Sequence, residues 1–294
     1  FTPYLKSKGP AYKQPQKRKL KRDTIVDFKN VTVKYRAVKG EPPKIFDDFS
    51  LQIGKGEKIA LIGSNGAGKS TMLKMMMGLI RPESGQVLLN GRPTIDLPKE
   101  ELGRTISMVY QNPEEMFIKD SIRKDIEYAM MVRKVEDYQK RTDELLEMFR
   151  LTDLQDRDGR LLSGGQMRRA SLAIGIALQP EILLLDEPTA NLDIATRREI
   201  MKTLQMLKGI TDTVVIATHD MQLVCDWAER LIVLSAGYVI ADGTKEEIFS
   251  DMYVRRQVGI RPPQICDMGR ALGIENPCFT IDEFMEYFRG EKYA

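Results

Sequence analysis

Histidine is almost absent from this chain of 294 residues. The only one, His219, follows a run of β-branched residues in the segment VVIATHDM (214–221). An isolated histidine is most often a surface or core residue without a special task. His219 therefore gains a function only if its neighbours require a polar group at the end of a strand.

Cysteine and long apolar stretches are scarce too. Cys225, Cys266 and Cys278 are odd in number and far apart in the sequence, which excludes a disulfide framework and a zinc-site spacing and suits a reducing cytoplasm. We expect each of them to be a small apolar filler. No uncharged apolar stretch reaches the roughly 18 residues that a membrane helix needs, and no secretory signal pattern opens the sequence.

Acidic residues are missing from positions 1–22, which carry eight Lys and Arg residues. The formal net charge of the whole chain is +3, but outside this segment 37 basic residues face 42 acidic ones, a net charge of −5. We therefore do not expect the body to bind polyanions by charge. The segment 1–22 is rich in Pro and Lys, which predicts a disordered or extended basic linker or tail. An arm that binds nucleic acid or lipid headgroups is the alternative.

Short apolar runs separated by helical patterns predict an α/β core. The runs EILLLD (181–186) and TVVIAT (213–218) are typical of strands that are buried on both faces of a parallel sheet. Residues 112–160 place apolar residues among charged ones at helical spacing, which predicts a helical insertion. Further strands are predicted at 24–35, at 44–63 as two strands joined at 54–56, at 85–94, at 104–110 and, as a closing hairpin, at 230–243.

The segment GSNGAGKST (63–71) fits the phosphate-loop pattern G-x-x-x-x-G-K-[ST] and lies between a predicted strand and a predicted helix. Glycines let backbone N–H groups approach phosphate oxygens, and the helix N-terminus adds partial positive charge. We expect Lys69 to reach the β- and γ-phosphates of ATP and the Ser70 hydroxyl to bind Mg²⁺. The predicted nucleotide-binding residues of this loop are Gly63, Ser64, Asn65, Gly66, Ala67, Gly68, Lys69, Ser70 and Thr71.

Two carboxylates end the apolar strand in EILLLDEPT (181–189). Neighbouring strand residues point to opposite sides, so adjacent carboxylates need not share a task. We expect Asp186 to hold Mg²⁺, directly or through water. Glu187 is then the candidate catalytic residue for the attacking water.

Three further segments carry a resemblance to a known family. After the phosphate loop, the chain carries YQNP (110–113), LSGGQ (162–166) and ANLD (190–193). This is the order in which these motifs occur in the ATPase subunits of ABC transporters, which residues 24–250 resemble. The resemblance implies an α/β fold with a P-loop NTPase core on a parallel sheet. It also implies an antiparallel β subdomain and an inserted helical subdomain at about 112–175. The implied ATPase domain is 23–250, followed by a short C-terminal helical appendage at 251–294.

The resemblance also implies roles for residues outside the phosphate loop. Tyr35 resembles the aromatic residue that stacks on adenine, although a core tyrosine on a strand is an alternative. Gln111 resembles the residue that contacts the metal or water and senses the γ-phosphate. His219 resembles the histidine that contacts the γ-phosphate and holds the water and Glu187 in place. It would thus act in catalysis with Glu187, Lys69 and Gln111.

The LSGGQ segment resembles the cap over ATP that is bound to the opposite subunit. A hydroxyl and bare backbone N–H groups before a helix form an anion site, which suits this role independently of the family. Asp193 resembles the residue that crosses between the two sites. The nucleotide-binding residues implied here are Ser163, Gly164, Gly165, Gln166 and Asp193.

The stretches LSGGQMRRASLAIGIAL (162–178), QNPEEMFIKDSIRKDI (111–126) and GIRPPQICDMGRALG (259–273) look like the ATPases of energy-coupling factor transporters. Those proteins import vitamins and transition-metal ions in prokaryotes. The resemblance implies Mg²⁺ and ATP, and a location on the cytoplasmic face of the membrane. It implies as partners a second ABC ATPase subunit, an integral membrane coupling subunit and a substrate-binding membrane subunit. The segment EEMF (114–117) lacks a Gln of the usual pattern, so we expect contacts to the membrane partner to differ there.

Several alternatives stay open. A soluble ABC ATPase that acts on ribosomes or nucleic acid would use the basic segment 1–22, but the acidic rest of the chain disfavours nucleic-acid binding. A scaffold that only binds nucleotide is disfavoured by Glu187 and His219. The segment 1–22 could also link this ATPase domain to a preceding ATPase half. The absence of an initial Met fits such a link, but an expression boundary explains that absence equally well. The C-terminal part has a predicted helix after Pro263 and capping boxes at 244–247 and 280–283. It also has an apolar stripe, which packs either on its own core or on a second ATPase. The stripe consists of Ile281, Phe284, Met285 and Phe288.

Overall fold

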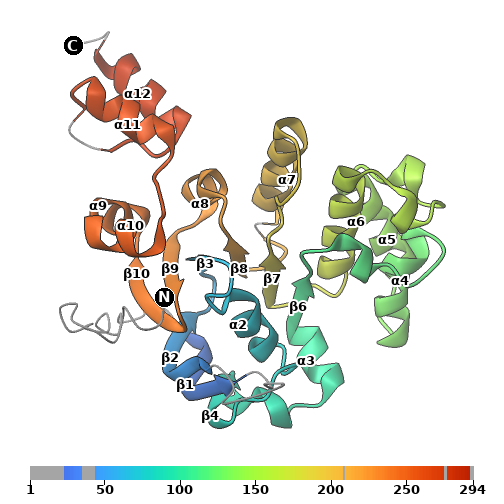
Figure 1. Ribbon diagram of the computed structural model, residues 1–294. Coiled ribbons are helices and arrows are strands. Elements are labelled where there is room, and N and C mark those ends of the chain that lie inside the picture. The colour runs from blue at the N-terminus through green and yellow to red at the C-terminus, as the bar shows by residue number, and fades with distance from the viewer. Residues whose placement is uncertain (1–22, 35–43, 208, 275–276, 292–294) are drawn as a thin grey trace.

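A six-stranded sheet forms the centre of the computed structural model, which describes residues 23–34, 44–207, 209–274 and 277–291. Its strand order is β10-β9-β3-β8-β7-β6, and Figure 1 shows the strands in this order from left to right. The first five in the chain run parallel, and β10 closes the sheet as an antiparallel hairpin with β9. The strands are β3 (Lys58–Gly63), β6 (Ile106–Val109), β7 (Ile182–Asp186), β8 (Thr213–Thr218), β9 (Arg230–Ser235) and β10 (Tyr238–Gly243).

The parallel strands are buried on both faces, as the continuous apolar runs predict. Ile182 and Leu184 of β7 belong to the core cluster on one face, whereas Leu183 and Leu185 belong to the cluster on the other. All five residues of β7 and all six of β8 are buried. Apolar side chains therefore stand on both faces along Ile182–Leu185 and Val214–Ala217, which explains why these segments do not alternate.

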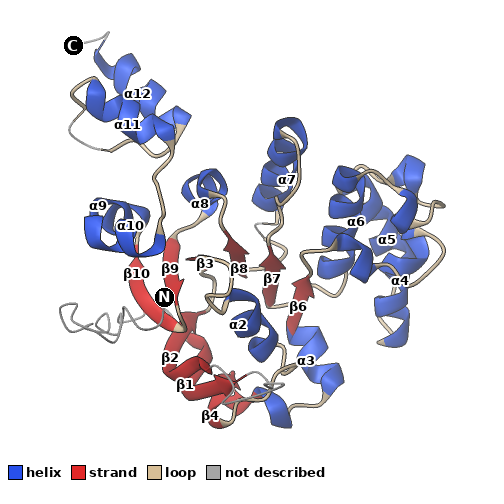
Figure 2. Cartoon of the chain, viewed as in Figure 1, coloured by secondary structure: helices blue, strands red, loops and turns tan. Residues whose placement is uncertain are grey.

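A second, antiparallel sheet packs against the first through helix α2 (Lys69–Met76). Its order is β2-β1-β4-β5, and Figure 2 shows it at the lower edge of the molecule. Asn90 and Gly91 both have positive φ angles, 50° and 79°, which is the conformation of a type I′ hairpin turn. The strands are β1 (Thr24–Lys34), β2 (Lys44–Gly54), β4 (Ser84–Leu89) and β5 (Arg92–Pro93).

Helices α4, α5 and α6 form a separate group beyond β6, at the right of Figure 1. Ile122, Ile126 and Met130 recur every four residues along α4, and all three side chains are buried. The helical insertion predicted at 112–160 is thus helical, while the domain boundaries stay a prediction. The α-helices between β5 and β9 are α3 (Lys99–Thr105), α4 (Ile122–Val132), α5 (Tyr138–Met148), α6 (Gly164–Ile176), α7 (Ile194–Met206) and α8 (Met221–Trp227).

One strand prediction is wrong at its start, and another extends beyond the described residues. Arg104 and Thr105, predicted as the beginning of a strand, end helix α3, and the Thr105 hydroxyl donates to the Glu101 carbonyl oxygen one turn earlier (3.1 Å). The β-branched threonine is typical of a strand, but its hydroxyl completes the last helical turn instead. Tyr35, the predicted adenine-stacking residue, lies outside the described residues.

The C-terminal residues fold into four short helices, α9 (Lys245–Ser250), α10 (Met252–Val258), α11 (Gln264–Ala271) and α12 (Ile281–Glu291). Both predicted capping boxes are present, at Thr244 and Thr280. Along α12, Phe284 is buried, whereas Ile281 and Met285 are 60% and 45% exposed. The apolar stripe therefore packs on the chain's own core at Phe284 and faces outward at Ile281 and Met285, while the side chain of Phe288 lies outside what the structure describes.

Across the described residues, no helix is both long and apolar enough to cross a bilayer. Cys225, Cys266 and Cys278 are buried free thiols, which agrees with their predicted role as apolar filler. Burial raises the pKa of the Cys266 thiol to about 11. A thiol of such high pKa is a poor nucleophile at neutral pH.

Arg230 is the centre of a largely buried ion-pair cluster, and its contribution to the free energy of unfolding can be tested. Its guanidinium, in a residue only 3% exposed, binds both carboxylate oxygens of Asp242 (2.7 Å each) and donates to Glu57 (2.6 Å) and to the Gln52 carbonyl oxygen (3.0 Å). Arg230→Ala removes the cation from two carboxylates whose side chains are only 16% (Glu57) and 9% (Asp242) exposed, so we expect urea denaturation to show a loss of about 3–5 kcal/mol.

The matched control is the exposed ion pair of Lys124 with Asp120. Lys124→Ala should cost less than about 1 kcal/mol because water screens the pair. Equal losses for Arg230→Ala and Lys124→Ala would contradict the assigned energetics.

Glu283 docks the appendage onto the rest of the chain. Its carboxylate accepts from Lys245 Nζ (2.6 Å) and from the Phe279 backbone N–H (2.6 Å). Burial alone would raise its pKa, but these hydrogen bonds outweigh burial and hold the pKa of Glu283 below its ordinary value of 4.5. The contact is therefore present above pH 4.5 and is lost as the pH falls through the lower pKa of the folded state.

Glu283→Gln should loosen α12 at neutral pH, because the amide cannot keep the charge-assisted bonds. Hydrogen exchange should accelerate in α12 and stay unchanged in α4. The exposed neighbour supplies the control, Glu286→Gln, for which exchange should match the unaltered chain. Unchanged exchange of α12 in Glu283→Gln would show that this contact does not dock the appendage.

Candidate active site

The carboxyl ends of β3, β8 and β7 meet at one edge of the sheet. Register pairs Ile62 of β3 with Thr218 of β8, and Asp186 of β7 with Ala217 of β8. The phosphate loop leaves β3, His219 follows β8 and Glu187 follows β7. Three segments that are far apart in the sequence therefore converge where ligands bind in parallel α/β sheets.

The phosphate loop has the backbone that its glycines were predicted to provide. Gly68 has a φ angle of 106°, and a Cβ there would lie 2.6 Å from the Phe46 ring. A Cβ at Gly63 would lie 2.4 Å from the Leu234 carbonyl oxygen. Both positions exclude larger residues, so the tight turn before α2 depends on glycine.

Lys69 is held over the loop that it closes. Its Nζ donates to the carbonyl oxygens of Gly63 (2.7 Å) and Ser64 (3.4 Å), and the residue is 7% exposed. Burial lowers the pKa of Lys69, and the carboxylates of Glu187 and Asp186 act in the opposite direction. The ammonium group is thus positioned within the loop and near the two acidic residues.

Ser70 and Asp186 lie together, close enough for the Ser70 hydroxyl to lower the pKa of the Asp186 carboxyl by hydrogen bonding. Burial raises the pKa of Asp186, while this hydrogen bond and the charge of Lys69 lower it. Two hard oxygen donors side by side fit Mg²⁺, which is usually bound by one or two protein oxygens together with substrate phosphates. Within the described part of the chain, no group of three or more His, Cys, Asp and Glu residues could hold a metal by itself.

Glu187 has its backbone in the left-handed region, with φ 47°. For a residue other than glycine this conformation costs on the order of 1–3 kcal/mol and must be held by its surroundings. The Glu187 N–H donates to the Ala217 carbonyl oxygen (2.8 Å), and its own carbonyl oxygen accepts from Ala190 (3.1 Å). These bonds fix the turn that aims the carboxylate towards the end of β8.

The Glu187 carboxylate meets His219 at that strand end. His219 Nδ1 lies 2.9 Å from it, and as carboxylate oxygens accept hydrogen bonds, the imidazole donates. The His219 side chain is 70% exposed and that of Glu187 only 8%. One ring nitrogen therefore holds the buried carboxylate, while much of the ring stays accessible to a ligand.

Sequence reasoning missed two neighbours of this pair. The buried Thr218 hydroxyl donates to Glu187 Oε2 (3.2 Å). Asp220 accepts from the Thr189 hydroxyl (2.9 Å), lies 3.5 Å from Arg197 Nε and caps helix α8. Both residues flank the only histidine, but nothing in the sequence indicates which distant side chains they contact.

The LSGGQ segment lies away from the phosphate loop of its own chain. In Figure 1, α6 stands with α4 and α5 beyond β6, whereas α2 lies below the middle of the sheet. From β3 to β6 there are three strand spacings, about 14 Å in total. Ser163 and Gly164 are exposed, and Ser163 caps α6 in a capping box with Gln166.

The remaining predicted site residues lie close to this segment. Gln111 is exposed just after β6. Asp193 caps α7, where its carboxylate accepts from Ala195 N (2.9 Å) and from the Thr196 hydroxyl (2.6 Å). A Cβ at Gly165 would lie 2.5 Å from Thr196 Cγ2. The starts of α6 and α7 therefore pack together and present the LSGGQ and ANLD segments side by side.

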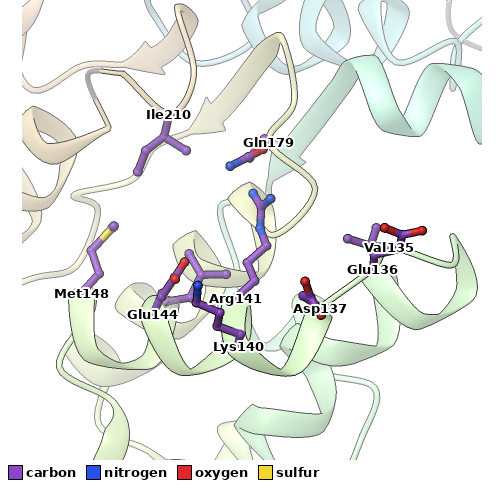
Figure 3. Close-up of a pocket in the computed structure, with 10 residues that line it drawn as sticks. Val135, Glu136, Asp137, Lys140, Arg141, Glu144, Met148, Gln179 and Ile210 are labelled. Carbon is purple, nitrogen blue, oxygen red and sulfur yellow. The ribbon is translucent and has the colours of Figure 1, made fainter.

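A pocket of about 320 Å³ lies elsewhere, along one face of α5 (Figure 3). Arg141 and Lys140 of α5, Gln179 after α6 and Ile210 before β8 contribute to its lining. Gln179 and Ile210 precede β7 and β8, so this pocket opens near the amino ends of the strands. It contains none of the predicted nucleotide-binding residues.

Comparisons with known proteins agree with this geometry. A family model described as ABC transporter matches residues 46–190. The cobalt import ATP-binding protein CbiO of Rhodobacter capsulatus is 35% identical over 238 residues, which cover 80% of this chain and 85% of that protein. The energy-coupling factor transporter ATP-binding protein EcfA1 of Caldanaerobacter subterraneus subsp. tengcongensis is 34% identical over 274 residues, covering 90% and 98%.

A solved structure, the dimeric post-hydrolysis state of the ATP-binding cassette MJ0796 bound to ADP and Pi, superposes with a TM-score of 0.67. It is 31% identical, and the match covers 75% of this chain and 98% of that one. These similarities extend over nearly the full length of the relatives and include the fold. The chain belongs to the ATP-binding proteins of ABC transporters, of the cobalt and energy-coupling factor type, and is an ATP hydrolase.

Proposed function

We propose that this chain powers the uptake of a small molecule, a vitamin or a transition-metal ion, through a membrane transporter at the cytoplasmic face of a prokaryotic cell. ATP would close a dimer of two ABC ATPase subunits, and hydrolysis would reopen it. The observation that carries the proposal is the place of the LSGGQ segment, whose Ser163 and Gly164 are exposed and which belongs to the helical group beyond β6, itself three strand spacings from β3 and its phosphate loop. A second subunit is the simplest source of the missing cap.

Binding of ATP would use the groups at the carboxyl edge of the sheet. Lys69 would turn from the Gly63 carbonyl oxygen to the β- and γ-phosphates, and the loop N–H groups would bind phosphate oxygens. Ser70, Asp186 and Gln111 would hold Mg²⁺, which neutralises phosphate charge when it is bound. Tyr35 would stack on the adenine.

Hydrolysis would depend on the pair of Glu187 and His219. Glu187 would orient or deprotonate the attacking water. His219 would hold that carboxylate through Nδ1 and offer its exposed side to the γ-phosphate. Both groups already lie in contact, so little reorganisation is needed when ATP arrives.

The partner's cap would complete the site. Ser163, Gly164, Gly165 and Gln166 of one subunit would cover the phosphates bound to the other, and Asp193 would cross between the sites. Since a ligand shifts an equilibrium only by its differential affinity, ATP would favour the closed dimer because only that state supplies both sets of donors. The helical insertion would pass the motion to a membrane coupling subunit, and a membrane substrate-binding subunit would select the cargo.

Glu187, the proposed base, gives a direct test of the hydrolytic step. Glu187→Gln keeps the shape of the side chain but cannot accept a proton, so we expect kcat to fall by about 10²–10⁴-fold. ATP binding should persist, because the phosphate-binding groups are unchanged. Phosphate release measures the first quantity, and fluorescent-nucleotide binding measures the second. Hydrolysis at the rate of the unaltered chain would refute the assigned role of Glu187.

The second prediction concerns the cap. At Gly164 the φ angle is not positive, and the nearest atom to an added Cβ is Leu192 Cδ2 at 3.9 Å. Gly164→Val should therefore change the free energy of unfolding by no more than about 0.5 kcal/mol. ATP binding to the single chain should also be unchanged, whereas hydrolysis and ATP-driven dimerisation should be lost.

Phosphate release, urea denaturation and light scattering measure the three effects of Gly164→Val. Gly165→Ala supplies the contrast, because Thr196 leaves no room for a Cβ there and its folding stability should fall. An active Gly164→Val variant that dimerises on ATP would remove this segment from the site.

A further inference from the structure

Arg168 is a buried cation at the boundary between the helical group and the central sheet. It lies on α6, five residues after Ser163, and is only 3% exposed. Among the described residues its guanidinium forms no ion pair with a carboxylate, and its Nε has no hydrogen-bond partner. Desolvation lowers the pKa of Arg168 to about 10, although the charge of Asp186 acts in the opposite direction. A buried, unpaired charge is costly, so its presence calls for an explanation.

The guanidinium of Arg168 donates to two successive backbone carbonyls. Nη1 donates to the Tyr110 oxygen (2.9 Å) and Nη2 to the Gln111 oxygen (2.8 Å). These carbonyls belong to the segment that follows β6 and carries the predicted γ-phosphate sensor. The planar fork of arginine can bridge two adjacent acceptors at once, which a lysine ammonium cannot do in the same fixed geometry.

The neighbouring arginine does something different. Arg169 Nη1 donates to Glu199 Oε2 of α7 (2.7 Å), and the Glu199 side chain is 50% exposed. The Arg169 side chain is only 17% exposed, but unlike that of Arg168 its guanidinium has a carboxylate partner. Of these two neighbours, Arg168 is the one that donates to the segment of Gln111.

We propose that Arg168 is a positioning residue, which fixes Gln111 relative to the helix that begins with the LSGGQ cap. The γ-phosphate sensor of one site and the cap over the other site then move as one body. This inference rests on the proposed function, because it assigns a route of communication between the two ATP sites. Arg168 touches neither ATP nor metal and acts through the backbone of residues 110–111.

The test is a double-mutant cycle with Gln111 on the full chain, together with any subunits that co-purify with it. Arg168→Met keeps much of the side-chain volume but removes both donors. We expect it to lower kcat by about tenfold or more, since a displaced catalytic group costs up to about 10²-fold. The KM for ATP should change far less, because the phosphate loop is untouched. Arg169→Met, the matched control, should keep the kcat of the unaltered chain.

A second measurement separates positioning from a general structural defect. In the Gln111→Ala background, Arg168→Met should lower kcat by less than about twofold, since residues that act as a unit are not additive. Multiplicative losses, equal in both backgrounds, would overturn the inference. If Arg168→Met does not fold, Arg168→Lys, which keeps the charge and one donor, completes the same cycle with the same two outcomes.

Two controls separate a failure of the proposed function from a failure of the role of Arg168. If the unaltered chain released no phosphate from Mg·ATP while Lys69→Ala behaved identically, the proposed function would fail. If the unaltered chain was active and Arg168→Met matched it in kcat, only the positioning role of Arg168 would fail.

Discussion

The register of β3, β8 and β7 is the constraint on which the rest of the structure depends. The pairs Ile62–Thr218 and Asp186–Ala217 place the residues that follow each strand next to one another. A slip of one residue along β8 would move His219 by about 3.3 Å, more than its contact with Glu187 could tolerate. Burial on both faces fixes this register, because Ile182–Leu185 of β7 and Val214–Ala217 of β8 alternate between two core clusters.

Much of the molecule could be predicted from local sequence. The phosphate loop, the buried parallel strands and the capping boxes are properties of short segments, and the structure has them where the sequence indicates. Thr105 shows the limit, since a hydroxyl that bonds one turn back outweighs strand propensity. The exposure of Ile281 and Met285 shows a second limit of prediction from sequence. Periodicity predicts which side chains share one face of a helix, but not what covers that face.

The contacts around the candidate site were less predictable. Arg168 and Arg169 are adjacent and alike in sequence, yet one is buried against carbonyls 57 and 58 residues away and the other forms an ion pair with Glu199 of α7. Asp220 likewise contacts Thr189 and Arg197 across the edge of the sheet. Such contacts depend on how α6, α7 and α8 pack against the sheet and against one another, which no local pattern specifies.

The account's central claim is that a single copy holds only part of the hydrolytic site, with the cap supplied by a partner. The most direct test is the specific rate of phosphate release at saturating Mg·ATP as the purified chain is diluted, with association followed by light scattering. We expect the rate per chain to fall as the dimer dissociates. A rate per chain that stays constant after scattering shows only monomers would contradict the claim.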